Sequence, residues 1–368
     1  MSTISFARGA PSPDIVDAAG LSAAAVRAFR ADPAGITSYG DAYGYLPLRT
    51  WIAAKHRVDV DKVLVTNGSL QADAFLFAHL VSPGDEVVVE RPTYDRTLRS
   101  LRGMGATVHA VSLRPDGLDV DELRKMLESG IRPRLAHIIP NYQNPAGVTL
   151  PLDRREALLG LAREFDFTVF EDDPYVDIRF RGPALPSLLT LDAGTGRVVH
   201  ASSFTKTVCP GVRVGYLIGD VELIAAIARR ATDTYISPGL VAQGIVHQFC
   251  VSGDIDRSIQ RVRAALSERA RILADELRTH IPDVRFTEPD GGYFLWVEFP
   301  EDVDVADLAV EAERREVTVV KGTDFVLEGG QHALRLAYAG VTGAEIAEGV
   351  RRLASAVESV RSGRLSDI

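Results

Sequence analysis

Residues 202–216, SSFTKTVCPGVRVGY, form the most informative stretch of this chain. A strand-like run, RVVHASSF, leads into it, a second, VRVGYLIG, leads away, and Pro210-Gly211 breaks the chain between them. We therefore expect Lys206 to lie on a short loop between buried strands. A poorly solvated amine has a lowered pKa, and only a neutral amine attacks a carbonyl group. Lys206 is therefore a candidate Schiff-base lysine.

Two further side chains of this stretch suit a phosphate group. Ser203 offers a hydroxyl three residues before Lys206, and Arg213 offers a planar cation seven residues after it. Taken alone, a lysine beside a turn is more often a solvated surface residue. The spacing of these three residues, with Pro-Gly between the last two, resembles the lysine signature of fold-type I pyridoxal-phosphate (PLP) aminotransferases. The resemblance is to the branch of 2-aminoadipate and kynurenine aminotransferases and MocR-like proteins.

The composition fits an ordinary globular protein with two lobes. The chain has 368 residues, of which 46% are hydrophobic and 25% are charged. A formal net charge of −9 argues against nucleic acid or an anionic membrane as the main partner. Two cysteines, Cys209 and Cys250, form no paired motif and offer no zinc site. With no recognisable signal peptide or membrane span, we expect a cytoplasmic protein.

The resemblance extends over nearly the whole chain and implies roles for residues outside the lysine loop. The run KVLVTNGSLQADAFLFAHLV reads as strand, turn and helix, with Ser69 and Leu70 at the helix start, where free N–H groups bind anions. In the family these positions bind the cofactor phosphate, Leu70 through its backbone, although the family more often has a polar residue there. An ordinary capped helix is the alternative. Tyr94 matches the tyrosine that stacks on the pyridine ring.

Polar residues at the ends of buried strands match the family as well. Asn144, in Asn-Pro-Ala-Gly, matches an asparagine that lies beside the substrate and donates to the ring oxygen of the cofactor; a plain Asn-Pro turn is the alternative. Asp172 and Tyr175 share the Asp-x-x-Tyr spacing of the family. The carboxylate would keep the pyridine nitrogen protonated, and the tyrosine would donate to the ring oxygen. Asp173 is adjacent, but the spacing to Tyr175 favours Asp172.

The resemblance also implies a substrate pocket shared by two chains. Arg335, between apolar neighbours in HALRLAYAG, matches the arginine that binds the substrate carboxylate, with a salt bridge to a core acid as the alternative. Arg8 and Gly9 lie in the entry segment that reaches the substrate pocket, and a solvated surface residue is the alternative for Arg8. Tyr39, five residues before Gly44, matches the tyrosine that reaches the phosphate of the neighbouring subunit.

These patterns predict an α/β protein. We expect a large lobe with a mostly parallel sheet flanked by helices, as in PLP-dependent transferases of fold type I, and a small α+β C-terminal lobe. The predicted divisions are an N-terminal arm with one short helix at 1–45, a large PLP-binding domain at 46–260 and a small domain at 261–368. The predicted function is ping-pong transfer of an amino group between an L-amino acid and a 2-oxo acid, with PLP, without metal, in a homodimer with shared active sites.

Two other functions stay open from the sequence. The same binding groups serve elimination, cyclisation and oxidation on this fold, so they do not separate these reactions from transamination. A MocR-type regulator uses the fold to sense a ligand, but it needs a basic helix-turn-helix head, and the entry segment here begins almost at Met1. We therefore expect an enzyme, whose amino donor and acceptor the sequence does not name.

Overall fold

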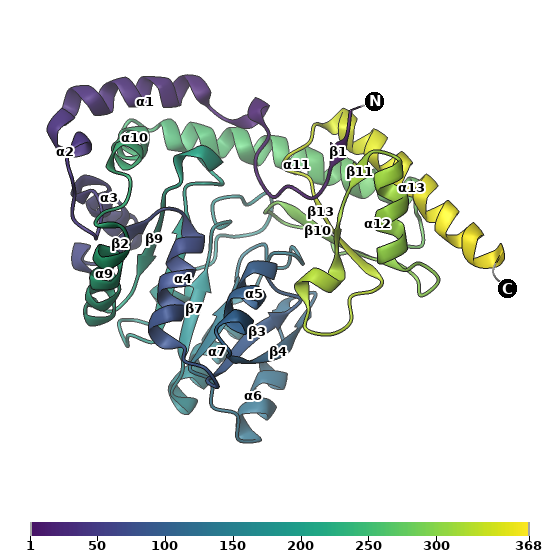
Figure 1. The fold of residues 1–368 in the computed structure, drawn as a ribbon, viewed down its shortest axis with the longest axis horizontal. Helices are drawn as coiled ribbons and strands as arrows, with labels where there is room; N and C mark the ends of the chain where they lie inside the picture. Colours follow the sequence, from purple (N-terminus) through teal and green to yellow (C-terminus); the bar gives the residue numbers. More distant parts are fainter. Residues whose placement is uncertain (1, 367–368) are drawn as a thin grey trace.

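A large, mostly parallel sheet forms the centre of the molecule. The computed structural model describes residues 2–366, and within them eight strands lie in the order β2-β9-β8-β7-β6-β3-β4-β5 (Figure 1). Neighbouring strands from β8 to β4 are parallel, whereas β9 is antiparallel to both of its neighbours and β5 is antiparallel to β4. The strands are β2 (Val63–Thr66), β3 (Glu86–Arg91), β4 (Thr107–Arg114), β5 (Gly117–Leu118), β6 (Leu135–Ile138), β7 (Thr168–Asp172), β8 (Val198–Ser203) and β9 (Gly215–Ile218). This arrangement confirms the predicted fold class.

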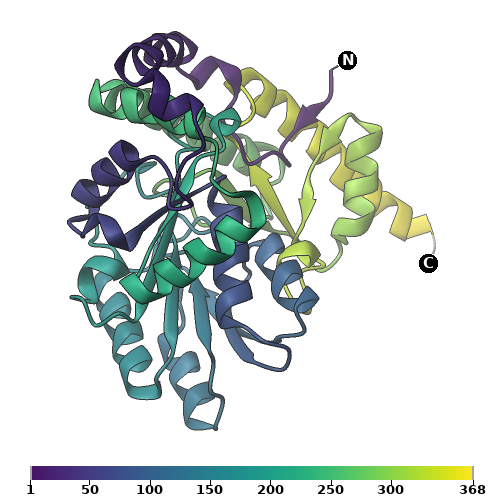
Figure 2. The same ribbon diagram turned by 60° about the vertical axis from the view of Figure 1, so that its left-hand side comes forward.

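Helices cover both faces of this sheet, which explains why β2, β6, β8 and β9 are buried along their whole length. Successive strand residues point to opposite faces: Phe170 of β7 packs with α4, α5 and α9, whereas Val169 packs with α6, α7 and α8. Figure 2 shows the sheet enclosed in this way. The helices are α3 (Leu46–His56), α4 (Ser69–Leu80), α5 (Asp95–Gly103), α6 (Val120–Glu128), α7 (Leu152–Phe165), α8 (Leu188–Leu191), α9 (Val221–Tyr235) and α10 (Leu240–Val251).

A second, smaller lobe is built on a three-stranded antiparallel sheet in the order β10-β13-β12. Its strands and helices are β10 (Phe294–Glu298), β12 (Val320–Lys321), β13 (Ala333–Ala337), α12 (Val305–Arg314) and α13 (Gly343–Ser366). The long helix α11 (Asp254–His280) joins the two lobes. Ile255 of α11 packs in a core with β2 and β9, whereas Val262 packs in the core of the small lobe.

The N-terminal segment is more ordered than its sequence suggests. In place of an arm with one short helix, it contains β1 (Ile4–Ser5), the 14-residue α1 (Ala18–Ala31) and α2 (Pro33–Thr37). The side chains of Asp17 and Asp32 cap α1 and α2 by accepting from Gly20 N and Gly35 N, and alanine favours helix within α1. Gly and Pro in the flanking turns conceal this in the sequence.

The first residues of the chain belong to the small lobe. Strand β1 pairs in parallel with β11 (Val317–Thr318), and Ile4 and Phe6 are buried in the small-lobe core. Helix α1 instead packs on α10 of the large lobe (Figure 1). Across residues 2–366, no helix combines the length and the apolar surface that a membrane span requires.

Candidate active site

A cavity of about 410 Å³ opens at the carboxyl ends of β7 and β8. Parallel strands gather the residues that follow them at one edge of a sheet, and this edge is where ligands bind in such folds. Nine residues predicted from the sequence line the cavity: Ser69, Leu70, Tyr94, Asn144, Asp172, Tyr175, Ser203, Lys206 and Arg213. Four residues that the sequence did not single out line it as well: Arg96, Ile139, Pro174 and Thr205. Thr205 lies inside the quoted stretch 202–216 and Arg96 lies two residues after Tyr94, whereas no local pattern marks Ile139.

Lys206 lies on the loop after β8, as the flanking strands predict. Its Nζ donates to the carbonyl oxygen of Gly9 at 2.6 Å and lies 5.5 Å from the ring centre of Tyr175 and 5.1 Å from that of Tyr293. Although the residue is partly accessible through the cavity, its amine is surrounded by protein. This burial lowers the pKa of the amine to about 8, and the nearby guanidinium of Arg335 acts in the same direction.

Gly9 can contact Lys206 in this way only because it has no side chain. A Cβ at residue 9 would lie 2.7 Å from the ring of Phe294, closer than atoms can pack. The glycine therefore lets the N-terminal segment pass directly over the small-lobe sheet and present its carbonyl oxygen to the amine.

An anion cradle lies at the start of α4. Gly68 precedes the helix with a φ of +88°, and the Arg213 guanidinium occupies the space that a Cβ at residue 68 would need. The same guanidinium donates to the carbonyl oxygen of Asn67 at 3.2 Å. Free N–H groups at a helix start, hydroxyls and a guanidinium together bind phosphate. Around the cavity, the hydroxyls belong to Ser69, Ser203 and Thr205, and the guanidinium belongs to Arg213.

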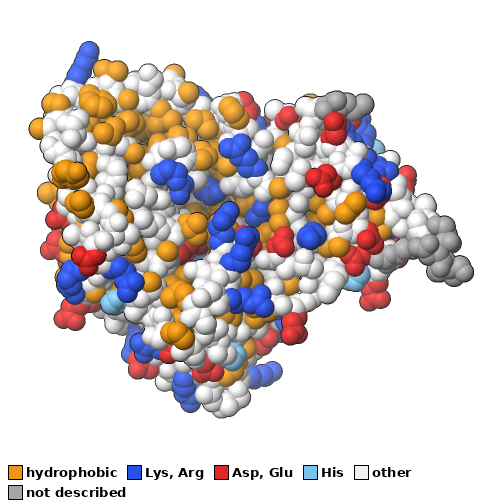
Figure 3. Space-filling view, viewed as in Figure 1, with side chains coloured by type: hydrophobic (Ala, Val, Ile, Leu, Met, Phe, Trp, Pro, Cys, Tyr) orange, Lys and Arg blue, Asp and Glu red, His pale blue; other side chains and the backbone are white. Residues whose placement is uncertain are grey.

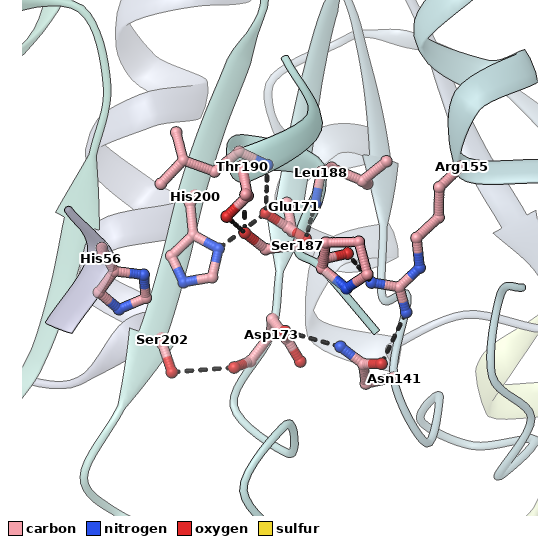
Figure 4. Close-up of polar contacts among 12 residues, drawn as sticks. His56, Asn141, Arg155, Glu171, Asp173, Ser187, Leu188, Thr190, His200 and Ser202 are labelled. Atoms are coloured by element: carbon pink, nitrogen blue, oxygen red, sulfur yellow. Dashed lines mark hydrogen bonds and ion pairs between the residues drawn. The ribbon is translucent and has the colours of Figure 1, made fainter. Parts of the chain in front are cut away.

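The structure separates Asp172 from its neighbour Asp173. Asp172 lines the cavity, and its Oδ1 is buried without a hydrogen-bond partner among the described residues. Asp173 instead accepts a hydrogen bond from Asn141 Nδ2 at 2.8 Å, and Asn141 Oδ1 accepts from Arg155 at 2.7 Å (Figure 4). The Asp173 backbone carbonyl accepts from Ser202 Oγ at 2.9 Å. Asp172 therefore lines the cavity and Asp173 does not.

A buried polar network anchors the strand that carries Asp172. Glu171 accepts hydrogen bonds from the backbone N–H groups of Leu188 at 2.7 Å and Leu189 at 3.1 Å, and its carboxylate lies 2.9 Å from His200 Nδ1 (Figure 4). The ring of His56 lies 4.9 Å from that of His200. Glu171, His200 and His56 do not line the cavity, so we infer that this network stabilises β7.

Arg335 lies next to the cavity. Its guanidinium donates to Asn144 Oδ1 at 3.1 Å and to the carbonyl oxygen of Ala7 at 2.8 Å, between the rings of Phe294 and Phe325 at 4.5 and 4.8 Å. In the part of the chain that the structure describes, no carboxylate lies within salt-bridge distance of it. The alternative of a structural salt bridge therefore finds no support, and the cation is available to a bound acid.

Arg8 and Tyr39 do not line the cavity of their own chain. The backbone on either side of Arg8 is fixed, because the carbonyl groups of Ala7 and Gly9 accept hydrogen bonds from Arg335 and Lys206. The Arg8 side chain is exposed and has no polar partner within residues 2–366. Tyr39 is 87% exposed.

Comparison with known proteins explains this constellation. The family model for aminotransferase class I and II matches residues 3–353. The chain belongs to this family. It is 33% identical over 361 residues to the 2-aminoadipate transaminase of Thermus thermophilus, covering 97% of this chain and 90% of that protein. The structure of an α-aminoadipate aminotransferase from Thermus thermophilus, solved with N-(5′-phosphopyridoxyl)-L-leucine, has a TM-score of 0.93 and 32% identity, covering 98% of this chain and 93% of that chain.

The aminotransferase is also similar to a regulator. The HTH-type transcriptional regulator TauR of Rhodobacter capsulatus is 34% identical over 300 residues, which cover 80% of this chain and 60% of that protein. The family and the enzymes that match over nearly their full length identify the activity: this aminotransferase uses PLP to transfer an amino group between an amino acid and a 2-oxo acid. The residues fit the cofactor, because the cavity offers a buried amine, an unpaired carboxylate oxygen and an anion cradle.

The lowered pKa of Lys206 gives a first prediction. We expect the rate at which the cofactor-free protein binds PLP covalently to rise with pH and to level off above about 8, because only the neutral amine reacts. Arg335→Gln should move the midpoint upward, since it removes a cation that disfavours protonation of the amine. Stopped-flow absorbance over a pH series measures both. A wild-type midpoint near the ordinary lysine value of about 10.4 would contradict a buried amine.

Proposed function

We propose that Lys206 holds the cofactor and serves as the proton-transfer base of transamination, in a homodimer whose two chains share each active site. The observation that carries this proposal is the buried Lys206 amine, with its lowered pKa, in one cavity with Asp172. When bound, PLP supplies an electron sink that stabilises negative charge at the substrate Cα. The remaining chemistry belongs to side chains of this protein.

Lys206 and Arg335 would perform the two substrate-directed tasks. The Arg335 guanidinium binds the substrate carboxylate, while Asn144 Oδ1 and the Ala7 carbonyl hold that guanidinium in position. The neutral Lys206 amine removes the proton from the substrate Cα and later returns a proton, because its pKa lies near neutrality. Arg335 would hold the substrate and the anion cradle would hold the cofactor phosphate. These two anchors limit rotation of the reactants and so select the bond that reacts.

The other cavity residues would hold the cofactor. The free Oδ1 of Asp172 keeps the ring nitrogen protonated, Asn144 and Tyr175 donate to the ring oxygen, and Tyr94 covers one face of the ring. The phosphate is held by the hydroxyls of Ser69 and Ser203, the backbone N–H of Leu70 and the guanidinium of Arg213.

An exposed apolar surface supports the homodimer. Figure 3 shows hydrophobic side chains gathered over the region where Figure 1 draws α1, α2 and α10. Exposed patches of this kind mark interaction sites. The exposed large apolar residues of this region and its neighbouring loops are Val26, Phe29, Tyr39, Leu46, Ile236 and Val241. Tyr39 contributes nothing to its own cavity, which supports a role in the site of the partner. We also propose a cytoplasmic location, since Cys209 and Cys250 are both free thiols.

An amino acid with an acidic side chain is the substrate class that we propose. The related enzymes act on 2-aminoadipate, whose side chain ends in a second carboxylate. In this chain the exposed guanidinium of Arg8 lies on a backbone segment fixed against Lys206 and Arg335, and it has no partner within residues 2–366. A distal carboxylate is a suitable partner for it.

The role of Lys206 is tested by substitution. Incubating the PLP-loaded wild-type protein with a panel of L-amino acids and 2-oxo acids should transfer the amino group, with the products identified by mass. Lys206→Ala should have no measurable turnover, because it lacks both the covalent link and the base. Lys55→Ala, which removes a lysine paired with Asp177 at the surface, is the control and should stay active. Normal turnover in Lys206→Ala would overturn the assignment.

The role of Arg8 is tested by specificity. In Arg8→Ala, the ratio of kcat/KM for acidic over neutral amino acids should fall about tenfold, because a charge-assisted hydrogen bond to the distal carboxylate is lost. The loss should lie mainly in KM. Arg8→Lys retains the charge and should retain most of the preference. If the ratio in Arg8→Ala equals that of the wild type, Arg8 is a solvated surface residue.

The shared site is tested with two impaired variants. Lys206→Ala keeps Tyr39, and Tyr39→Ala, which must first prove clearly defective alone, keeps Lys206. In a mixed dimer one site collects both changes and the other site is intact. Random pairing makes half of the dimers mixed, so co-expression should recover about a quarter of wild-type activity. If mass spectrometry confirms mixed dimers and activity does not recover, Tyr39 does not serve the partner's site.

A further inference from the structure

A second buried carboxyl group lies behind Asp172. Asp73, in the first turns of α4, is 3% exposed, and its Oδ1 is buried without a hydrogen-bond partner in the described structure. Burying an unpaired carboxyl group is unfavourable, and the neighbouring helix positions Ala72 and Leu76 are occupied by apolar side chains. The reaction as derived above makes no use of Asp73, so its presence requires another explanation.

Side chains on one face of the sheet connect Asp73 to Asp172. Asp73 and Thr97 of α5 line the same cavity, of about 260 Å³, between α4 and α5. Thr97 Oγ1 lies 3.5 Å from His137 Nε2, and the same nitrogen lies 3.5 Å from Asp172 Oδ2. His137 is fully buried and packs against Phe170. Thr97 and His137 therefore link the cavity that Asp73 lines to Asp172.

Electrostatics couples the two carboxyl groups. Burial raises the pKa of Asp73 well above its ordinary value, and the negative charge of Asp172 raises it further. Two neighbouring carboxylates in a poorly solvated site do not both ionise readily. Because burial and the nearby Asp172 both oppose its ionisation, Asp73 is the group of this pair that favours its protonated form.

The charged groups around Asp73 are both acidic and basic, and the exposed Arg96 lines the same cavity. Glu90 of β3, whose pKa burial raises to about 8, is itself acidic, and Tyr94 stays neutral. Helix α5 contributes Arg96 and Arg99, of which Arg99 is paired with Asp95.

The other elements that pack on α4 carry few charged groups near Asp73. Helix α9 places Arg229 and Arg230 near His79, which lies further along α4, and the ring of its Tyr235 stacks on the ring of Phe75. Of the strands packed on α4, β8 carries His200, which pairs with Glu171, and β2 and β9 carry no acid or base except Tyr216, which contacts His56.

We infer that Asp73 is a positioning residue for the ring nitrogen of the cofactor. Asp73 and Asp172 form a buried pair of carboxyl groups, and this pair carries a single negative charge until a cation binds at Asp172 Oδ1. The inference rests on the proposed role of Asp172. A protonated ring nitrogen at Asp172 cancels the charge that opposes ionisation of Asp73. Asp73 then releases its proton to solvent, and its carboxylate adds to the field that keeps the ring nitrogen protonated. Binding of the ring is thereby linked to loss of one proton from Asp73.

The linkage has a definite sign. Ionised Asp73 favours the protonated ring, so the affinity of the protein for the ring should increase with pH through the range in which Asp73 loses its proton. A residue that cannot ionise removes this increase. Pyridoxamine phosphate is the suitable probe, because it has the same ring and phosphate but forms no covalent bond with Lys206.

The experiment is titration calorimetry of cofactor-free protein with pyridoxamine phosphate from about pH 6 to about pH 9, in two buffers of different ionisation enthalpy at each pH. The wild type should gain about tenfold in affinity relative to Asp73→Asn across this range, and it should release more protons on binding. Asp73→Leu, which suits the apolar neighbours Leu70 and Phe77, should behave like Asp73→Asn and serves if the amide variant folds poorly.

Two controls separate the possible causes. Asp192 is as buried as Asp73, at 3% exposed, but it holds a distant turn by accepting from Arg197 N, so Asp192→Asn should keep the wild-type pH dependence. Asp172→Asn should bind more weakly than the wild type at every pH. If Asp172→Asn binds normally, the role of Asp172 is wrong. If Asp172→Asn is weakened while both Asp73 variants follow the wild type in affinity and proton release, the carboxyl pair is refuted.

Discussion

The site depends on keeping one amine poorly solvated. Among residues 2–366, Lys206 Nζ donates a hydrogen bond to the carbonyl of Gly9 and lies near the rings of Tyr175 and Tyr293. These groups come from the N-terminal segment, the large lobe and the small lobe, so no single lobe desolvates the amine. The charge of Arg335 lowers the pKa of the amine further, and this effect is larger than the opposite effect of Asp172. The reactivity of the lysine is therefore a property of the whole tertiary structure.

The alternation of side chains along β7 divides the acids of this region between two tasks. Glu171 points to the face covered by α8, where both oxygens of its carboxylate have hydrogen-bond partners, whereas Asp172 points to the face covered by α4 and α5 and has one oxygen without a partner in the described structure. Asp173 follows the strand and is held by Asn141. Three consecutive carboxyl groups thus occupy three environments, and only the middle one faces the cavity. A one-residue slip of the strand would exchange these environments.

Much of the site could be predicted from the sequence because its residues lie in short motifs at strand ends. The loop around Lys206 and the Asp-x-x-Tyr spacing are local patterns that survive without knowledge of the fold. The links of His137 to Asp172 and of Asp73 to the same cluster could not be predicted. A histidine inside a buried strand and an acid inside a helix have no local signature, and only the packing of α4 and α5 on the sheet brings them together. The sequence predicts only one short helix in residues 1–45, because flanking glycine and proline residues conceal the length of the alanine-rich α1.

The hydrogen bond between the Ala7 carbonyl and Arg335 joins residues 328 positions apart, and the bond between Gly9 and Lys206 spans 197 positions. During synthesis on the ribosome, the strands of the large sheet, from β2 to β9, emerge well before Arg335 does. The first residues of the chain, although made first, cannot take their final place until β13 and β11 exist to receive them. Since domains fold as units while the chain is made, the large lobe can form early and the catalytic pocket is completed last. We therefore expect a chain that ends before β11 to form the large sheet without the contacts that the N-terminal segment makes with β11 and Arg335.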